Sequence, residues 1–293
     1  MLPNSSAVGH RFLAVAVDIV TSMASELVPI AAGVHAWLVD EHSHSATNSG
    51  VVISADGLTV IDAGPNPTMT APLAEAVAAL TELPVRRLVF TGSHIDVVGG
   101  GAAFPLAAVY GSGQCSHLLD QPADPTVWGR LHPTLDFTDV ATRPVSHTVS
   151  EPAHLCPASI AVPIPGPQFE SLVVQVPGAN VVFAGSVATF GVTPLGYEAD
   201  FPRWIETLDQ LLGWGEIFVP AHGPIGGTEE VIALRNYLEA VIAANGNPGS
   251  MADGPWSRWV DPHLTAINIE RAYMLQSGDP GPPPSLLSLL AQE

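Results

Sequence analysis

Four polar loops, each directly after a short apolar run, carry the residue types that can do chemistry in this chain. The most informative is Thr-Gly-Ser-His-Ile-Asp-Val-Val-Gly-Gly-Gly at 91–101, in which His94 and Asp96 stand two positions apart. The other three loops are Asp62-Ala63-Gly64, Gly185-Ser186 and Pro220-Ala221-His222-Gly223-Pro224. Binding and catalytic residues concentrate in loops held by a rigid scaffold. We therefore expect one site at this edge of the fold, with His94, Asp96 and His222 as candidate acid–base residues.

The apolar runs before these loops predict the elements that position them. Strands are expected at 33–39, 50–54, 58–61, 87–91, 107–110, 171–176, 181–184 and 217–219, with hairpin signals at Asp56-Gly57 and Pro177-Gly178. Helical spacing of apolar residues predicts helices over 70–83, 202–212 and 229–244. Between 122 and 167 we expect β-structure and loops. This order predicts two sheets packed face to face with helices outside.

The domain organisation follows from the same survey. Residues 1–25 are expected to form an N-terminal extension, residues 26–277 one α/β domain, and residues 278–293 a proline-rich, loosely attached tail.

Charge and cysteine usage exclude several classes of function. The chain has 9 basic and 28 acidic residues, all the basic ones arginine, and a net charge of −19. Such a surface repels phosphate and anionic lipid, so neither nucleic acid nor a membrane is expected as a partner. Absence of lysine rules out Schiff-base chemistry. Cys115 and Cys156 are expected to be reduced thiols, and the predicted compartment is the cytoplasm.

Between Val34 and Tyr237 the order and spacing of these segments resemble the metallo-β-lactamase fold superfamily. The segments are GVHAWLV, NSGVVISADGLTVIDAG, RLVFTGSHIDVVGG, SLVVQVPGANVVFAG and FVPAHGP. The resemblance implies an αββα sandwich of two mixed β-sheets flanked by helices. It also implies a groove that usually holds two zinc or iron ions, and hydrolysis of lactams, thioesters, lactones or phosphoesters.

Most of the metal ligands that the resemblance implies are replaced in this sequence. The family loop Thr-His-x-His-x-Asp-His is here Thr91-Gly92-Ser93-His94-Ile95-Asp96-Val97. The next family histidine falls at Pro167 and the bridging aspartate at Ser186, whereas the final histidine is kept as His222. One metal position therefore retains only His94, and the other retains Asp96 and His222.

A catalytic zinc ordinarily has three protein ligands, so no cofactor is expected. The alternative is a single zinc held by His94, Asp96 and His222. Under that alternative, additional ligands would come from His42, His44, His117 or His147.

Each candidate residue has a structural and a functional interpretation. His94 and Asp96 either hold the loop turn by hydrogen bonds or form an acid–base pair, and for His222 we favour function because two prolines hold its loop. Ser186 lacks a Gly-x-Ser-x-Gly elbow, which favours a small replacement residue over a nucleophile. Ser186, Ser93 and Gln168 are predicted to contact substrate. Asp62 is predicted to be a turn residue that caps backbone amides.

The leading functional hypothesis is a metal-independent enzyme of small-molecule, secondary metabolism. Gly191-Val192-Thr193-Pro194, VPAHGP and INIERAYML are similar to the branch with actinobacterial polyketide cyclases and thioesterases. We therefore expect a polyketide cyclase or a thioesterase- or lactonase-like hydrolase acting on an apolar or acyl substrate.

Two alternatives to this hypothesis remain, a zinc-dependent hydrolase with replacement ligands and a non-catalytic small-molecule-binding homologue. A homodimer is possible under each of them. The stretch from Trp256 to His263 is either an apolar lid over the groove or a helix end packed on the body.

Overall fold

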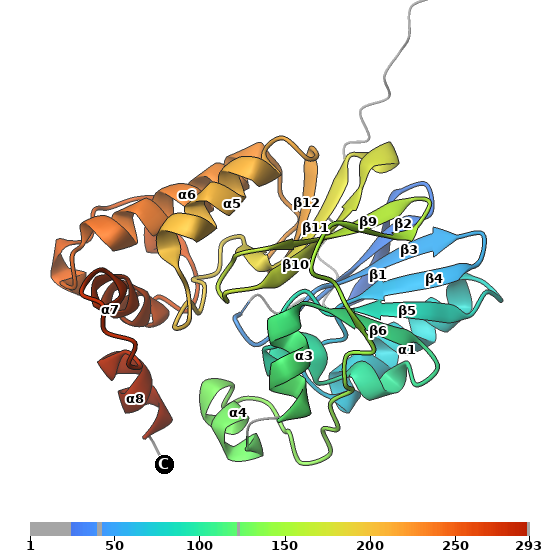
Figure 1. Ribbon diagram of the computed structural model, residues 1–293, viewed down its shortest axis with the longest axis horizontal. Coiled ribbons are helices and arrows are strands. Elements are labelled where there is room, and N and C mark those ends of the chain that lie inside the picture. Colours follow the sequence, from blue (N-terminus) through green and yellow to red (C-terminus); the bar gives the residue numbers. More distant parts are fainter. Residues whose placement is uncertain (1–24, 40–42, 122–123, 292–293) are drawn as a thin grey trace, which may run out of the picture.

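The computed structural model of this 293-residue chain describes residues 25–39, 43–121 and 124–291. The predicted N-terminal extension lies outside these residues apart from its last position, and His42 also lies outside them. The described chain folds into two facing sheets with helices on both outer sides (Figure 1).

The first sheet has seven strands in sequence order. Its antiparallel part comprises β1 (Glu26–Ala31), β2 (Val34–Leu38), β3 (Ser49–Ser54) and β4 (Gly57–Ile61). Helix α1 (Pro67–Leu80) then crosses over to the parallel strands β5 (Val85–Val89), β6 (Ala108–Gly111) and β7 (His147–Thr148). The change from hairpins to crossovers makes the sheet mixed, as predicted.

The second sheet has five strands in the order β12-β11-β10-β9-β8. Three antiparallel pairings join β8 (Ala153–Cys156), β9 (Ser159–Ile164), β10 (Ser171–Val176) and β11 (Val181–Thr189). Helix α5 (Phe201–Leu211) connects β11 to the parallel strand β12 (Ile217–His222), and α6 (Thr228–Ala243) follows it.

Three buried apolar clusters define the four layers. The middle cluster lies between the sheets and includes Val52, Leu172 and Phe183, each almost fully buried. A second cluster packs α1 against the first sheet, and a third packs α5 and α6 against the second. This arrangement confirms the predicted αββα sandwich.

Several helices differ from the sequence-based expectation. Helix α1 begins earlier than predicted because Asn66 caps it by accepting the Met69 N–H and Pro67 occupies its first turn. The sequence did not indicate α3 (Gly113–Asp120), α4 (Pro125–Leu131), α7 (Leu264–Gln276) or the short α2 (Ile95–Val98). Helix α4 interrupts the region that we expected to hold only strands and loops.

The expectation of a loosely attached tail is wrong for its central part. Residues Pro284–Leu290 form helix α8, and the side chain of Leu286 is only 4% exposed. Leu286 packs with Leu264 and Ile267 of α7 and with Leu131 of α4. Because this contact buries apolar surface on three helices, it fixes α8 to the domain.

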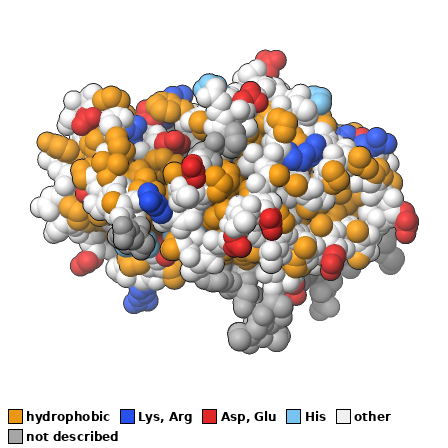
Figure 2. Space-filling model, turned by 90° about the horizontal axis from the view of Figure 1, so that it is seen from below, with side chains coloured by type: hydrophobic (Ala, Val, Ile, Leu, Met, Phe, Trp, Pro, Cys, Tyr) orange, Lys and Arg blue, Asp and Glu red, His pale blue; other side chains and the backbone are white. Residues whose placement is uncertain are grey.

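Within the described residues, no helix combines the length and the apolar character needed to cross a membrane. On the face shown in Figure 2, basic side chains are few and scattered among apolar and neutral ones. That face therefore offers phosphate groups little concentrated positive charge.

Candidate functional site

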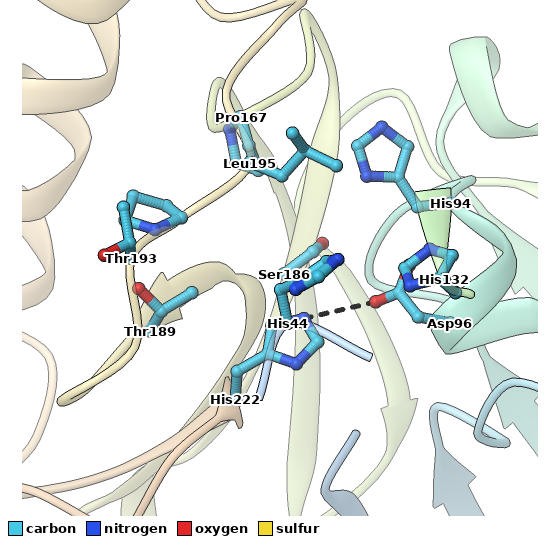
Figure 3. Close-up of a pocket in the computed structure, with 11 residues that line it drawn as sticks. His44, His94, Asp96, His132, Pro167, Ser186, Thr189, Thr193, Leu195 and His222 are labelled. Carbon is cyan, nitrogen blue, oxygen red and sulfur yellow. Dashed lines mark ion pairs between the residues drawn. The ribbon is translucent and has the colours of Figure 1, made fainter. Parts of the chain in front are cut away.

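Three of the four polar loops, those of His94, Ser186 and His222, meet in a small cavity between the sheet ends, whereas the loop of Asp62 does not line it. His94 is the N-cap of α2, Asp96 lies in the first turn of α2, and His222 ends β12. The cavity has a volume of about 30 Å³. It is lined by His44, His94, Asp96, His132, Pro167, Ser186, Thr189, Thr193, Pro194, Leu195 and His222 (Figure 3). Since a water needs about 10–15 Å³, the cavity has room for one or two waters or a small reacting group.

Asp96 and His222 form a buried pair at the centre of this cavity. His222 Nε2 lies 3.2 Å from Asp96 Oδ2, and His222 Nδ1 lies 2.9 Å from the carbonyl oxygen of Ala46. A carbonyl oxygen only accepts hydrogen bonds, so Nδ1 must carry a proton. Nε2 faces a second acceptor, Oδ2 of Asp96. A hydrogen bond between these two atoms requires one further proton, which Nε2 and Oδ2 share. The pair therefore holds a shared proton beside the cavity.

The surroundings of Asp96 favour the charged form of its carboxyl group. Burial by itself raises the pKa of Asp96, but the hydrogen bond and electrostatic attraction of His222, with a further contribution from His94, outweigh it. The net result is a pKa well below the usual range of an aspartate, so Asp96 is a carboxylate.

Asn48 and Gly223 hold the loop of His222 in place. Asn48 Nδ2 donates to the carbonyl oxygens of Pro220 and Gly223 at 3.1 and 2.7 Å. Gly223 has φ +93°, and a Cβ there would lie 1.8 Å from the Phe190 carbonyl oxygen. Glycine is therefore required next to His222, and the sequence analysis missed Asn48 as the residue that holds this loop.

His94 lies on the opposite wall of the cavity and has its own carboxylate. Its Nε2 is buried 3.6 Å from Glu198 Oε2, longer than a hydrogen bond, and its ring stacks on Tyr197 with centroids 5.4 Å apart. Burial alone would lower the pKa of His94, but the interaction with Glu198 and the charge of Asp96 reverse this and raise it. Glu198 thus orients His94 and raises its basicity, a role that the sequence analysis did not predict.

Ser186 belongs to a buried hydrogen-bond chain that begins at Asp62. Asp62 accepts from the N–H and hydroxyl of Thr91 at 2.8 and 2.7 Å, which fits the predicted capping role. The Thr91 hydroxyl lies 3.2 Å from Ser186 Oγ and accepts from the Ser186 N–H at 3.0 Å. Burial raises the pKa of Asp62 to about 7, although the hydrogen bonds from Thr91 act in the opposite direction and lower it. None of these described contacts places a histidine on Ser186, so no activated nucleophile results.

The predicted substrate contacts Ser93 and Gln168 bind one another. The Gln168 side chain accepts from the Ser93 N–H at 2.9 Å and donates to Ser93 Oγ at 2.6 Å and to Glu198 Oε2 at 3.1 Å. With both amide ends engaged, Gln168 clamps the His94 loop to Glu198. Contact of either residue with substrate stays a prediction.

Two further histidines, His44 and His132, reach the cavity. The sequence analysis named only His44, as an additional ligand under the zinc alternative. Their rings stack with centroids 5.2 Å apart. His44 contacts Asp261 Oδ2 through Nδ1 at 3.0 Å and the Leu131 carbonyl through Nε2 at 2.8 Å. Burial lowers the pKa of His132 to about 4 despite the Asp96 charge, so this ring is neutral. His44 has no nitrogen left for a metal, and His117 and His147 do not line the cavity.

The donor set does not fit the metal ions that the fold resemblance implies. Among the described residues, no group of three or more His, Cys, Asp or Glu side chains is arranged to hold a metal. A Cβ on Gly92 would lie 2.7 Å from Ser186 Oγ and 2.9 Å from Gln168 Oε1, so the space for a histidine there is filled. Val97 is fully buried in the core beside α1 and does not line the cavity. No step of the chemistry is therefore derived through a metal.

The stretch near Trp256 does not form an apolar lid over this cavity. Trp256 and Trp259 pack against Tyr237 of α6, with ring centroids 6.0 and 5.2 Å away. The packed-helix interpretation is therefore the correct one, and this stretch approaches the site through Asp261 and His263, which contact His44, and through Val260, whose carbonyl oxygen accepts from the Thr193 N–H.

Comparison with known proteins identifies the family. The model of the metallo-beta-lactamase superfamily matches residues 43–235, more than half of the chain. The chain belongs to this superfamily.

Solved structures of similar fold are metallo-beta-lactamases. FIM-1 from Pseudomonas aeruginosa, in its mono-zinc form, has a TM-score of 0.59 and 20% identity over 74% of this chain and 95% of its own. The enzyme from Erythrobacter litoralis, with beta-mercaptoethanol in the active site, has a TM-score of 0.60 and 16% identity over 76% and 99%. At these identities the likeness concerns the fold.

Proposed function

We propose that this chain is a metal-independent enzyme of small-molecule metabolism that works by proton transfer, as a cyclase or a thioesterase- or lactonase-like hydrolase would. The observation that carries the proposal is the buried Asp96–His222 pair, in which both ring nitrogens face acceptors. A side chain held with a spare proton beside a water-sized space is suited to general acid catalysis.

The opposite wall supplies a complementary group for such a reaction. The Nε2 of His94 points at Glu198, so Nδ1 is the nitrogen left to act on a substrate. In an aldol-type dehydration, His94 would take the proton from the carbon next to a carbonyl, and His222 would protonate the departing hydroxyl. The C–H electrons form the new C=C bond, the C–O bond breaks, and water leaves. Positioned proton transfer of this kind contributes about 10²–10⁴-fold in rate.

The experiment compares Asp96→Asn with Asp261→Asn, because both aspartates contact a histidine but only Asp96 contacts His222. Asparagine can donate to His222 Nε2 and keep the packing, so folding should be retained while the spare proton is lost. Against a panel of uncharged β-hydroxyketones, thioesters and lactones, Asp96→Asn should lower kcat/KM by about 10²–10⁴-fold. Asp261→Asn should change it little.

Three outcomes would contradict the proposal. Unchanged turnover in Asp96→Asn would show that the pair is structural. Absence of turnover by the wild type would favour the binding-protein alternative. Stoichiometric zinc, whose removal abolishes turnover, would favour the zinc-dependent hydrolase.

A further inference from the structure

A second, larger cavity lies beside the acid–base site, with a volume of about 210 Å³. His94 and Leu195 line both cavities, so they form the wall between them. The other apolar side chains of the larger cavity come mainly from α2, α3 and α4 and are Ile95, Val98, Leu118, Leu119, Val127, Trp128 and Leu131. Three of its polar groups, Ser93, Gln168 and Glu198, gather next to His94, where Gln168 contacts the other two, and Gln121 and Thr142 also line the cavity.

Charge restricts what this cavity can bind. Among the described lining residues of both cavities there is no arginine, whereas Glu198 lines the larger one and Asp96 the smaller one. A carboxylate or phosphate group that enters these cavities loses its hydration. Among the described lining residues, the only side chains that could offset this loss with positive charge are histidines that already contact an acid. An uncharged ligand meets no such penalty.

Volume restricts the ligand further. An apolar cavity of about 150 Å³ accepts a benzene ring, whereas pockets for drug-sized ligands usually measure about 300–1,000 Å³. The cavity of about 210 Å³ therefore matches one ring or an acyl chain of similar size, and a fused polycyclic skeleton exceeds it.

We propose that this larger cavity binds the apolar end of the substrate, and that the substrate is an uncharged ester, thioester or ketone whose apolar part is a single ring or a short chain. A ligand seated there lies against His94, on the wall that faces Asp96 and His222. The inference rests on the proposed function for its chemistry, but it concerns binding and is tested without turnover.

The test measures binding of methyl benzoate to the intact protein by calorimetry, with two neighbouring variants of α3. Leu118 lines the cavity, and the exposed His117 does not. Leu118→Trp should fill the cavity and weaken methyl benzoate binding by about 10–100-fold, the value of burying one ring. His117→Trp should bind like the wild type, and circular dichroism and Tm confirm that both variants fold.

Two related probes test the charge and size arguments. Benzoate, which has the same ring with a negative charge, should bind at least about tenfold more weakly than methyl benzoate. Methyl anthracene-9-carboxylate should not bind measurably, because its three fused rings exceed the cavity.

The proposal is overturned if methyl benzoate does not bind, if Leu118→Trp binds it as well as the wild type, or if benzoate or the anthracene ester binds better. These outcomes are separate from the test of function. Binding that follows the proposal, combined with unchanged turnover in Asp96→Asn, would refute the acid–base function and leave the ligand site standing.

Discussion

Removal of His222 tests whether the pair with Asp96 exists as a buried ion pair. In His222→Ala, the Asp96 carboxylate stays buried at 4% exposure, and its remaining described contact is the Thr47 hydroxyl at 3.5 Å. Breaking a buried pair by deleting one partner costs about 3–5 kcal/mol. For a chain of this length about 1 kcal/mol corresponds to about 2 °C, so at pH 7 we expect Tm to fall by about 5–10 °C.

The loss should shrink as the pH falls, and the direction follows from the pKa of Asp96. In the wild type this pKa is depressed below 3.8, so its contribution to stability is present above about pH 4 and is lost only as the pH falls further. In the variant, burial without the histidine raises the pKa above 3.8, so the variant is destabilised mainly while the carboxylate is charged. Between pH 7 and pH 4.5 the difference in Tm should therefore decrease.

Differential scanning calorimetry of both proteins across this pH range measures the effect. His117→Ala serves as the control, since an exposed histidine should change the free energy of unfolding by no more than about 0.5 kcal/mol. Adding Asp96→Asn to His222→Ala removes the stranded charge and should recover part of the loss. A Tm difference below about 2 °C at pH 7, or one that grows on acidification, would refute the buried ion pair.

Three further predictions concern the metal, the filled ligand position and the tail helix. Protein purified without chelator should hold well under one equivalent of zinc or iron by mass spectrometry, and chelation should leave Tm nearly unchanged; stoichiometric metal that resists dialysis would contradict the fit of the donor set. Gly92→Ala should lower the free energy of unfolding, measured by chemical denaturation, by about 1–3 kcal/mol because the new Cβ displaces the hydrogen-bonded side chains of Ser186 and Gln168. Gly178→Ala is the control, since a Cβ at Gly178 meets nothing within 4 Å and should leave this free energy nearly unchanged. Leu286→Ala should cost about 2–5 kcal/mol because that side chain is 4% exposed, and Leu287→Ala, at 52% exposed, should cost under about 1 kcal/mol; equal losses would show that α8 does not pack as described.

The sandwich was predictable because its strands carry strong local signals. The alternation of apolar and polar residues and the turn that follows predict β10 at Ser171–Val176, and both ends are correct. The helical spacing of apolar residues predicts the helices of the crossovers after β4 and β11. The proline-rich composition of 278–293 hides helix α8, because Pro284 occupies its first turn, where the missing N–H of proline costs nothing. Helix α4 starts in the same way, with Asp124 as its cap and Pro125 after it. Strand β1 contains Pro29, which the edge of a sheet tolerates.

The convergence of His94, Asp96 and His222 was predictable from loop order, but their partners were not. Glu198 and His132 have no motif, and their contacts join residues far apart in sequence, as between Ser45 and His132, which are 87 residues apart. Such contacts depend on how loops pack once the sheets are in place, which local pattern does not encode. The buried environment of the site was also not predictable, and it means that activity and stability must be measured together on every variant.

The cavity is surrounded by acids and histidines that lie in pairs. Three carboxylates approach it, and each contacts an imidazole: Asp96 with His222, Glu198 with His94, and Asp261 with His44. A buried carboxylate is costly unless it is paired, and in a binuclear centre the cations would meet that need. Ser186 adds no charge to the cavity, and its hydroxyl lies 3.2 Å from the Thr91 hydroxyl in the hydrogen-bond chain that begins at Asp62. The histidines beside these acids therefore act as favourable partners for carboxylates that would otherwise be costly to bury.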